Sequence, residues 1–346
     1  MWEALAELPL VVEGYALQRL QGEPAFGHDR GTDLVRLQGG GETGLGEDIT
    51  TYLPEGSAAP ELPLAGEWTL GSFCAHLAGV EQWTEEPPWD LAHNWRNWAY
   101  ESAALDLALR QAGTSIADAL RRAPRPVRFV NSFGLGDPPQ FATLRERLDR
   151  YPHLRFKLDA EPTWSRDLLE EVAGTGAVDT IDFKGQYGLE VKEPDALVPL
   201  YECVVELFPD AILEDPHDLP GIAEVLAPHA DRVSYDAPIR SIEDLDSVPI
   251  PSRIVNVKPT RIGSIRALLE LYAHCDGNGI RMYGGGMGEL GVARGQIQLL
   301  AGMFSPDAPN DIAPPGFNAL EPAEGLPPSP LAPDPAPVGF RRNADR

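Results

Sequence analysis

Short apolar runs of four to six residues alternate with longer amphipathic segments after about residue 125. Runs of this length are typical of buried parallel strands, and apolar residues spaced three or four apart predict the helices between them. The predicted strands are 127–131, 154–159, 180–184, 211–215, 232–236, 253–258 and 280–283, and the clearest helices are 165–172, 197–207, 222–226 and 265–275. With an eighth strand near 311–317, this α/β pattern predicts a closed (β/α)8 barrel of the TIM type.

The segment before the barrel has a different pattern. Residues 32–38 and 43–51 predict the two strands of a hairpin around the glycines at 39–41, and residues 95–112 predict a long amphipathic helix. We therefore expect an α+β domain at 1–124, the barrel at 125–320 and a Pro-rich tail at 321–346. The composition of the tail fits either an extended wrap or a disordered end.

Acidic residues outnumber basic ones, with 53 Asp and Glu against 28 Lys and Arg and a net charge of -25. This balance disfavours nucleic acid or an anionic membrane surface as a partner, because phosphates would be repelled. Cys74, Cys203 and Cys275 are far apart and predict neither a disulfide framework nor a zinc site. No apolar stretch has the length of a membrane span. We expect a cytoplasmic protein that acts on a small molecule, and a homo-oligomer is compatible with the sequence.

Lysine is scarce in this chain. The lysines are Lys157, Lys184, Lys192 and Lys258, and the other basic residues are arginines. A lysine at an apolar position therefore calls for a specific reason. Proton transfer is one, because the pKa of lysine can be lowered while arginine stays protonated.

Charged side chains stand at the ends of the predicted barrel strands. In chain order they are Lys157, Asp182, Glu214, Asp236 and Lys258, about one strand-helix unit apart. The carboxyl ends of barrel strands meet at one rim, so these groups should converge. Carboxylates that converge at an apolar rim require a cation between them, and oxygen ligands suit Mg²⁺, with Mn²⁺ as an alternative.

Such an ion would acidify the proton next to a bound substrate carboxylate by stabilising the enediolate. The two lysines, on strands two and six, would lie on opposite sides of the ion. One can then act as base and the other as acid. The sequence therefore predicts a metal-dependent enzyme that acts on a small-molecule carboxylate.

With these residues, the chain resembles the enolase superfamily and, within it, the muconate-lactonizing subgroup of mandelate racemase-like and muconate cycloisomerase-like enzymes. The resemblance covers about residues 30 to 300, and the order and spacing of its motifs make it specific. The motifs are Leu34-Val-Arg-Leu, Gly44-Leu-Gly-Glu, Glu101-Ser-Ala-Ala-Leu-Asp-Leu-Ala, Leu213-Glu-Asp-Pro, Val257-Lys-Pro-Thr-Arg-Ile-Gly and Gly285-Gly-Met-Gly-Glu-Leu-Gly.

The resemblance implies a modified barrel preceded by an α+β capping domain. It also implies that Asp182, Glu214 and Asp236 bind the metal and that Lys157 and Lys258 are catalytic. The chain departs from the family pattern at several positions. Arg155 replaces the first lysine of the K-x-K motif, Lys184 stands where the family often has Asn, and Ala237 where it often has Glu.

Strand seven lacks the histidine of the mandelate racemase branch, which sets that branch aside. The two opposed lysines favour an isomerase, either a racemase or epimerase or a cycloisomerase. A lyase on the same site, such as a dehydratase of the o-succinylbenzoate synthase type, is an alternative. So are a Schiff-base lyase that acts through Lys258 and a non-catalytic relative.

Several residues have weaker assignments. Leu158-Asp159-Ala-Glu resembles the usual third-strand motif, so Asp159 competes with Asp182 as a ligand, although counting strands back from Lys258 favours Asp182. Loops at 22–29 and 48–53 are expected to set specificity. Candidate substrate contacts, each with a plain structural alternative as a salt-bridge partner, loop residue or helix-terminal charge, are Arg155, Lys184, Asn256, His217, Glu289 and Asp311.

Overall fold

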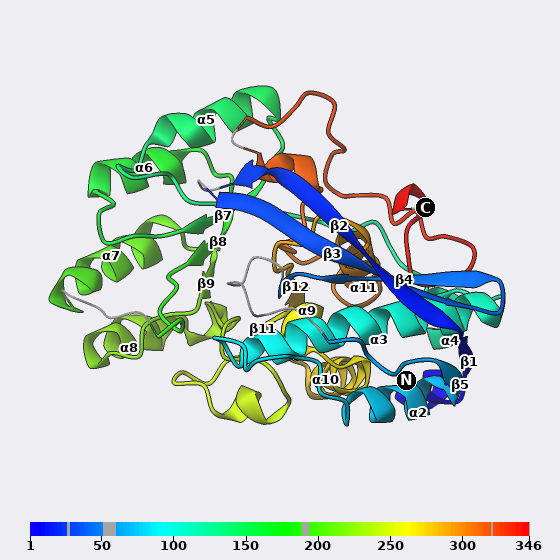
Figure 1. The fold of residues 1–346 in the computed structure, drawn as a ribbon. Helices are drawn as coiled ribbons and strands as arrows, with labels where there is room; N and C mark the ends of the chain where they lie inside the picture. The colour runs from blue at the N-terminus through cyan, green and yellow to red at the C-terminus, as the bar shows by residue number, and fades with distance from the viewer. Residues whose placement is uncertain (26–27, 51–59, 189–193, 320, 346) are drawn as a thin grey trace.

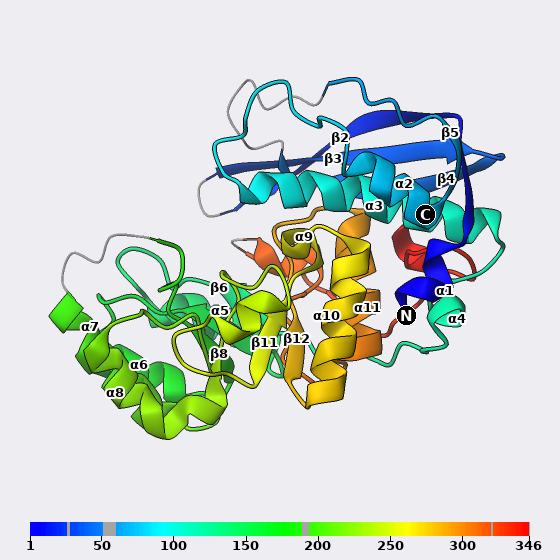
Figure 2. The ribbon, with the colours of Figure 1, turned by 90° about the horizontal axis from the view of Figure 1, so that it is seen from below.

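The computed structural model describes residues 1–25, 28–50, 60–188, 194–319 and 321–345. A capping layer of strands and helices lies over one end of a parallel β/α barrel (Figures 1 and 2). One hydrophobic cluster runs from β1, β3 and α3 of the cap through the barrel strands to α10 and α11. No helix among the described residues is both long enough and apolar enough to cross a membrane.

The capping layer is built on a three-stranded antiparallel sheet of β2 (Gly14–Ala25), β3 (His28–Gly39) and β4 (Glu42–Asp48). The predicted hairpin is confirmed, and its turn uses positive φ angles at Gly40 and Gly41. The remaining elements are α1 (Trp2–Ala6), the antiparallel pair β1 (Pro9–Val12) and β5 (Gly66–Thr69), α2 (Leu70–Leu77), α3 (Leu91–Gln111) and α4 (Ile116–Leu120).

Helix α3, which includes most of the predicted helix at 95–112, packs directly on β4. The two backbones approach so closely that a Cβ atom on Gly44 or Gly46 would lie about 2 Å from the carbonyl oxygen of Ala103 or Ala99. This contact explains the glycines of the Gly44-Leu-Gly-Glu motif in physical terms, since only glycine leaves room for it.

Hydrogen bonds from α3 and from β4 fix the cap to the barrel. Asn94 and Asn97 of α3 each donate a hydrogen bond of 2.7 Å to the barrel, to the carbonyls of Arg261 and Gly263. Glu47 of β4 accepts hydrogen bonds from the amides of Leu290 at 2.6 Å and Ala293 at 3.1 Å, at the start of α11. A carboxylate is favourable there because helix N-termini carry unpaired N–H groups and partial positive charge.

The barrel contains a five-stranded parallel sheet in the order β10-β9-β8-β7-β6 and a separate parallel pair, β11-β12. Single bridges join Tyr235 to Val255 and Gly285 to Asp311, and they continue the ring where regular strands stop. The strands are β6 (Asn131–Phe133), β7 (Phe156–Asp159), β8 (Val178–Asp182), β9 (Ile212–Glu214), β10 (Val233–Ser234), β11 (Ile254–Val257) and β12 (Arg281–Gly284).

Helices lie between these strands as the periodicity predicts. They are α5 (Phe141–Arg150), α6 (Arg166–Gly174), α7 (Pro194–Leu207), α8 (Pro220–Leu226), α9 (Pro259–Ile262), α10 (Ile265–Asn278) and α11 (Val292–Phe304). Short 3-10 helices are η2 (Ala227–Arg232), η3 (Glu243–Asp246), η4 (Pro315–Asn318) and η5 (Asn343–Asp345). The predicted barrel architecture with its cap is therefore confirmed.

Two predicted strands are wrong in detail. The eighth, near 311–317, is a single bridge at Asp311 followed by η4, because prolines at 314 and 315 cannot donate ladder hydrogen bonds. The first begins at Asn131 instead of residue 127. The amides of Val127 and Val130 bind the carbonyls of Leu331 and Asn310 instead, so they do not join a regular strand.

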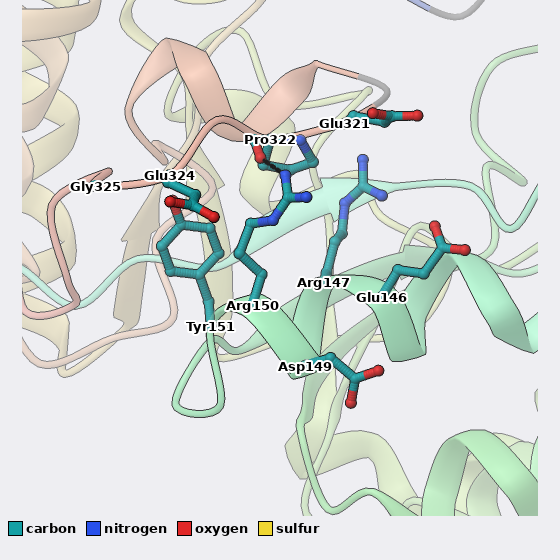
Figure 3. Close-up of a pocket in the computed structure, with 9 residues that line it drawn as sticks. All are labelled: Glu146, Arg147, Asp149, Arg150, Tyr151, Glu321, Pro322, Glu324 and Gly325. Atoms are coloured by element: carbon teal, nitrogen blue, oxygen red, sulfur yellow. Dashed lines mark hydrogen bonds between the residues drawn. The ribbon is translucent and has the colours of Figure 1, made fainter.

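The described part of the tail, 321–345, is an extended wrap that returns to the cap. Figure 3 shows its first residues above the end of α5, where Arg150 donates to the carbonyl of Pro322, beside a pocket of about 780 Å³. Farther along, Phe340 donates its amide to Asp106 of α3 at 2.6 Å, and Arg341 forms a buried ion pair with the same carboxylate. The wrap thus connects the last residues with the capping helix.

Candidate active site

The carboxyl ends of the barrel strands bring the central predicted residues together. Asp182 and Glu214 are the last residues of β8 and β9 and stand opposite each other in register. Asp236 follows β10 by two residues, and Lys258 directly follows β11. Lys157, in β7, has only 1% of its side chain exposed. Charged side chains from five strand ends therefore occupy one buried region.

Lys157 lies among three carboxylates. Its Nζ is 3.0 Å from Asp182 Oδ2 and 3.5 Å from Asp311 Oδ2, and it donates a close hydrogen bond to Glu214 Oε1. Burial alone would lower the pKa of this ammonium group, but the carboxylates of Asp182 and Glu214 outweigh it and raise the pKa well above its usual value. Lys157 therefore stays protonated while these carboxylates remain its partners.

Oxygens of Asp182, Glu214 and Asp215 lie within 4.8 Å of one another, and all three carboxylates are buried. Burial raises the pKa of Glu214 to about 8 and that of Asp215 to about 6. Burial acts in the same direction on Asp182, but Lys157 and Lys184 outweigh it and lower its pKa to about 2. Mutual repulsion among buried carboxylates is the condition that a bound cation relieves.

Asp215 has a partly structural role. Its two oxygens accept hydrogen bonds from the backbone amides of Asp236 and Ala237, at 2.7 and 2.9 Å. These bonds hold the turn after β10 against the end of β9. Asp215 thereby positions Asp236, which it neighbours in the same buried region.

Asp236 stands at the other side of the centre, and cations hold it there. Lys258 Nζ is 2.8 Å from its Oδ2, Arg261 forms a close ion pair with its Oδ1, and Tyr187 donates a hydrogen bond of 3.3 Å. Burial would raise the pKa of Asp236, but Arg261 and Lys258 lower it far below the usual range. Asp236 is not one of the three carboxylates whose oxygens lie within 4.8 Å of one another, so its role as a metal ligand stays a prediction.

Lys184 and Asp159 lie at the edge of the cluster. Lys184 binds Asp182 Oδ2 closely, lies 3.2 Å from Asp159 Oδ1 and keeps about a third of its side chain exposed. Asp159 is directly opposite Asp182 in the register of β7 and β8. Both residues therefore belong to the site, as the sequence suggested, and they share one ammonium group.

Asn256 and Asp311 are also brought to the centre. The Nδ2 of Asn256 is 3.5 Å from Glu214 Oε1, while its buried Oδ1 has no hydrogen-bond partner within the described residues. Asp311 faces Lys157 from the bridge that replaces the eighth strand. A buried amide oxygen without a donor beside a carboxylate cluster points to a group that the protein alone does not supply.

Arg155, Glu289 and His217 have partners outside the carboxylate cluster, and their assignment as substrate contacts stays a prediction. Arg155 precedes β7, at the opposite end of the barrel, where it forms an ion pair with Asp179. Glu289 is buried against Thr260 Oγ1 and the amide of Met287, so its oxygens are occupied.

His217 lies in the loop after β9, where its ring nitrogen and its amide both bind the hydroxyl of Tyr201. This histidine therefore has a structural partner. Of the loops expected to set specificity, 26–27 and 51–53 lie outside the described residues, as do the side chains of 23–30.

The sequence interpretation missed Arg261, Tyr187 and Tyr283. Arg261 lies inside the Val257-Lys-Pro-Thr-Arg motif, and its buried guanidinium could have been inferred as the partner of Asp236. Tyr283 of β12 donates to Glu214 Oε2 and lies 2.8 Å from Ser234 Oγ. Tyr187 belongs to the loop after β8, and no sequence signal distinguished it.

Models of one protein family match both parts of the chain. The model of the C-terminal domain of DUF8230, described as a domain of unknown function, matches residues 123–319, and that of the DUF8230 N-terminal domain matches residues 3–119. The chain belongs to the DUF8230 family.

Relatives with assigned names come from the enolase superfamily. The chain is similar to an o-succinylbenzoate synthase of Geobacillus stearothermophilus, at 25% identity over 62% of this chain and 58% of that protein. It is also similar to an N-succinylamino acid racemase of Thermus thermophilus, at 27% identity over 81% of this chain and 77% of that protein. The match thus spans less than two thirds of the length of the synthase.

Among solved structures, a dipeptide epimerase from Methylococcus capsulatus complexed with a Mg ion has a TM-score of 0.65 at 19% identity, covering 88% of this chain and 92% of that one. This likeness establishes the fold. The resemblance to the enolase superfamily and the predicted capped barrel are therefore confirmed.

Proposed function

We propose that this protein is a metal-dependent enzyme that removes and returns the proton next to a substrate carboxylate. One observation carries the proposal. Lys157 from β7 and Lys258 from β11 enter the same buried centre from different strands, with Asp182, Glu214 and Asp236 between them in chain order and at neighbouring strand ends. Amines on two sides of an anionic, oxygen-rich centre suit proton transfer at one carbon.

The donor set of the centre fits a divalent cation. Its oxygens come from buried carboxylates, three of which approach within 4.8 Å, and the orphaned Oδ1 of Asn256 adds a neutral oxygen nearby. Asp182, Glu214 and Asp236 would hold Mg²⁺ or, alternatively, Mn²⁺. Bound there, the ion would neutralise the carboxylates and withdraw electrons from the carboxylate of the substrate.

The chain's own residues divide the proton chemistry. Lys258 contacts one carboxylate, Asp236, whose charge Arg261 already balances. Lys157 contacts carboxylates on three segments, which keep it protonated. We therefore assign to Lys258 the base role, in which it removes the proton, and to Lys157 the acid role, in which it delivers a proton to the opposite face of the same carbon. The two roles are exchanged when the opposite stereoisomer is the substrate.

The names of the relatives support two reaction types, racemisation or epimerisation on the one hand and a lyase reaction on the other. An N-succinylamino acid racemase and a dipeptide epimerase both invert a centre next to a carbonyl carbon, which suits two opposed amines. An o-succinylbenzoate synthase supports a lyase outcome on the same site. We place the racemase or epimerase first, with a small-molecule carboxylate as substrate.

Exchange of the α-proton in D₂O tests the proposal. N-acylated amino acids and dipeptides with Mg²⁺ are expected to incorporate deuterium, observed by proton NMR, and EDTA should abolish the exchange. The Lys258→Met variant should lose it, while Arg166→Met, in a surface ion pair with Glu206, should keep it. A borohydride-trapped adduct on Lys258 formed without metal would support the Schiff-base lyase instead, and metal binding without exchange would support the non-catalytic relative.

Two further expectations belong to this proposal. Cys74, Cys203 and Cys275 are all free thiols, which supports a reducing, cytoplasmic location. A homo-oligomer stays a prediction that sedimentation analysis can test.

A further inference from the structure

We propose that Lys184 is a built-in counter-cation that holds Asp182 while no metal is bound and transfers to Asp159 when a metal binds. The inference rests on the proposed function, because it assumes that Asp182 is a metal ligand. It goes further by giving Lys184 and Asp159 a shared role that neither catalysis nor ligation supplies.

The geometry places Lys184 between two acceptors. Its Nζ binds Asp182 Oδ2 closely and lies 3.2 Å from Asp159 Oδ1. The two carboxylates face each other across neighbouring strands β7 and β8, so a small rotation of the lysine side chain exchanges one acceptor for the other. The lysine needs no backbone movement to leave Asp182.

The backbone fixes the lysine at this point. Lys184 has a φ of 54°, in the left-handed region that non-glycine residues rarely adopt, and its amide donates to Asp182 Oδ1 at 3.0 Å. The next residue, Gly185, packs so tightly that a Cβ atom there would lie 2.3 Å from the amide nitrogen of His217. The loop thus aims Lys184 at the end of β8.

Burial distinguishes Lys184 from the other cations of the site. Its side chain is 34% exposed, against 1% for Lys157, 7% for Lys258 and 2% for Arg261. Among the described site residues, Lys184 is the cation that can most easily leave a carboxylate, because it loses the least packing and keeps contact with water. A metal ion that approaches Asp182 would therefore displace Lys184 first.

Asp159 completes the exchange. Its side chain is 32% exposed, but its Oδ1 atom is shielded from solvent and has no hydrogen bond with good geometry within the described residues, although Lys184 Nζ is 3.2 Å away. A shielded carboxylate oxygen without such a bond can accept one from an ammonium group. Asp159 then acts through Lys184 as a positioning residue and does not bind the metal itself.

A double-mutant cycle on metal affinity tests this inference. Binding of MgCl₂ and MnCl₂ without substrate is measured by titration calorimetry for the wild type, Lys184→Met, Asp159→Asn and the double variant. Lys184→Met should bind roughly tenfold more tightly, the size expected for coupling between contacting charged groups. Asp159→Asn should weaken binding several-fold, because Lys184 loses its second acceptor. In the Lys184→Met background, Asp159→Asn should change affinity by less than about twofold.

The other outcomes separate the two proposals. If Asp159→Asn weakens binding equally in both backgrounds, Asp159 is itself a ligand and the inference is wrong. An unchanged or weaker affinity of Lys184→Met overturns it as well. If no variant binds metal, the proposed function fails together with it. Lys184→Gln replaces Lys184→Met if the latter misfolds by circular dichroism, and Arg166→Met, which removes a surface cation, should leave affinity unchanged.

Discussion

The two sides of the buried centre differ in their balance of charge. On the β7–β9 side, the carboxylates of Asp159, Asp182 and Glu214, joined by that of Asp311 from beside β12, face the ammonium groups of Lys157 and Lys184. On the β10–β11 side, the carboxylate of Asp236 faces both Lys258 and Arg261. The first side has surplus negative charge and the second surplus positive charge. In the proposed function, this imbalance would attract a divalent cation to the first side and a substrate anion to the space between the two sides.

Replacement of Lys157 or Lys258 should give the largest difference in stability between the two sides. Lys157→Met leaves Glu214 buried without an ammonium partner and Asp182 with Lys184 alone, so it should lower the free energy of unfolding of the metal-free protein by roughly 3 kcal/mol. Lys258→Met leaves Asp236 paired with Arg261 and should cost only about 1 kcal/mol. Urea denaturation with EDTA present measures both. Equal losses would contradict the charge imbalance.

The pH dependence of stability should sharpen the comparison. Burial raises the pKa of Glu214 to about 8 in the folded protein, so the folded state holds a proton that the unfolded state releases near pH 4.5. This contribution is complete below pH 4.5 and is lost as the pH rises through 8. In an Asp215→Asn background, the protein with Glu214 should therefore lose stability relative to Glu214→Gln across this window.

Other groups act outside this window or cancel from the difference. The lowered pKa of Asp182, about 2, affects stability only at more acidic pH, where its contribution is lost as the pH falls. Buried Glu47 and Glu101 are the same in both proteins, and Asp215, whose raised pKa of about 6 falls inside the window beside Glu214, is replaced by Asn in both. Metal-free urea titrations at pH 5, 6.5 and 8 give the slope, and parallel curves for the two proteins would refute a proton on Glu214.

The two tyrosines that touch carboxylates provide the smallest test. Tyr283 is fully buried and donates to Glu214, while Tyr187 is 42% exposed and donates to Asp236. Tyr283→Phe should destabilise the protein by about 1 kcal/mol, because a buried acceptor loses its donor. Tyr187→Phe should change stability by less than about 0.5 kcal/mol, since water can replace the hydroxyl. Thermal unfolding measures the pair, and a larger loss at Tyr187 would reverse the order.

The sequence predicted those features that follow from strand periodicity. Because strands and helices alternate at a regular spacing, the residues at strand ends could be counted, and the count placed Lys157, Asp182, Glu214 and Lys258 together. The scarcity of lysine added an independent signal. Asp159 and Asp182, the two candidates for the metal ligand on the third strand, both reach the centre. Which of them binds the metal therefore stays a prediction.

The details that were missed depend on contacts between distant segments. Strand spacing could not show that Asp236 would be held by Arg261, or that Glu289 would be occupied by Thr260 and a nearby amide. Periodicity also assigned residue 127 to a strand, whereas its amide binds Leu331 in the tail. Arg261, Thr260 and Leu331 are each more than twenty residues from the residue that they bind. The amide that binds Glu289 belongs to Met287, in a turn whose geometry no local sequence pattern encodes.

The return of the tail to α3 has a consequence for how this sequence can vary. Arg341 and Asp106 form a buried ion pair although 235 positions separate them in the chain. A change at either residue alone would leave the other's buried charge without its ion-pair partner, so natural variants should replace the two residues together. Covariation between these positions in related sequences would mark the tail as an inherited part of the capping layer.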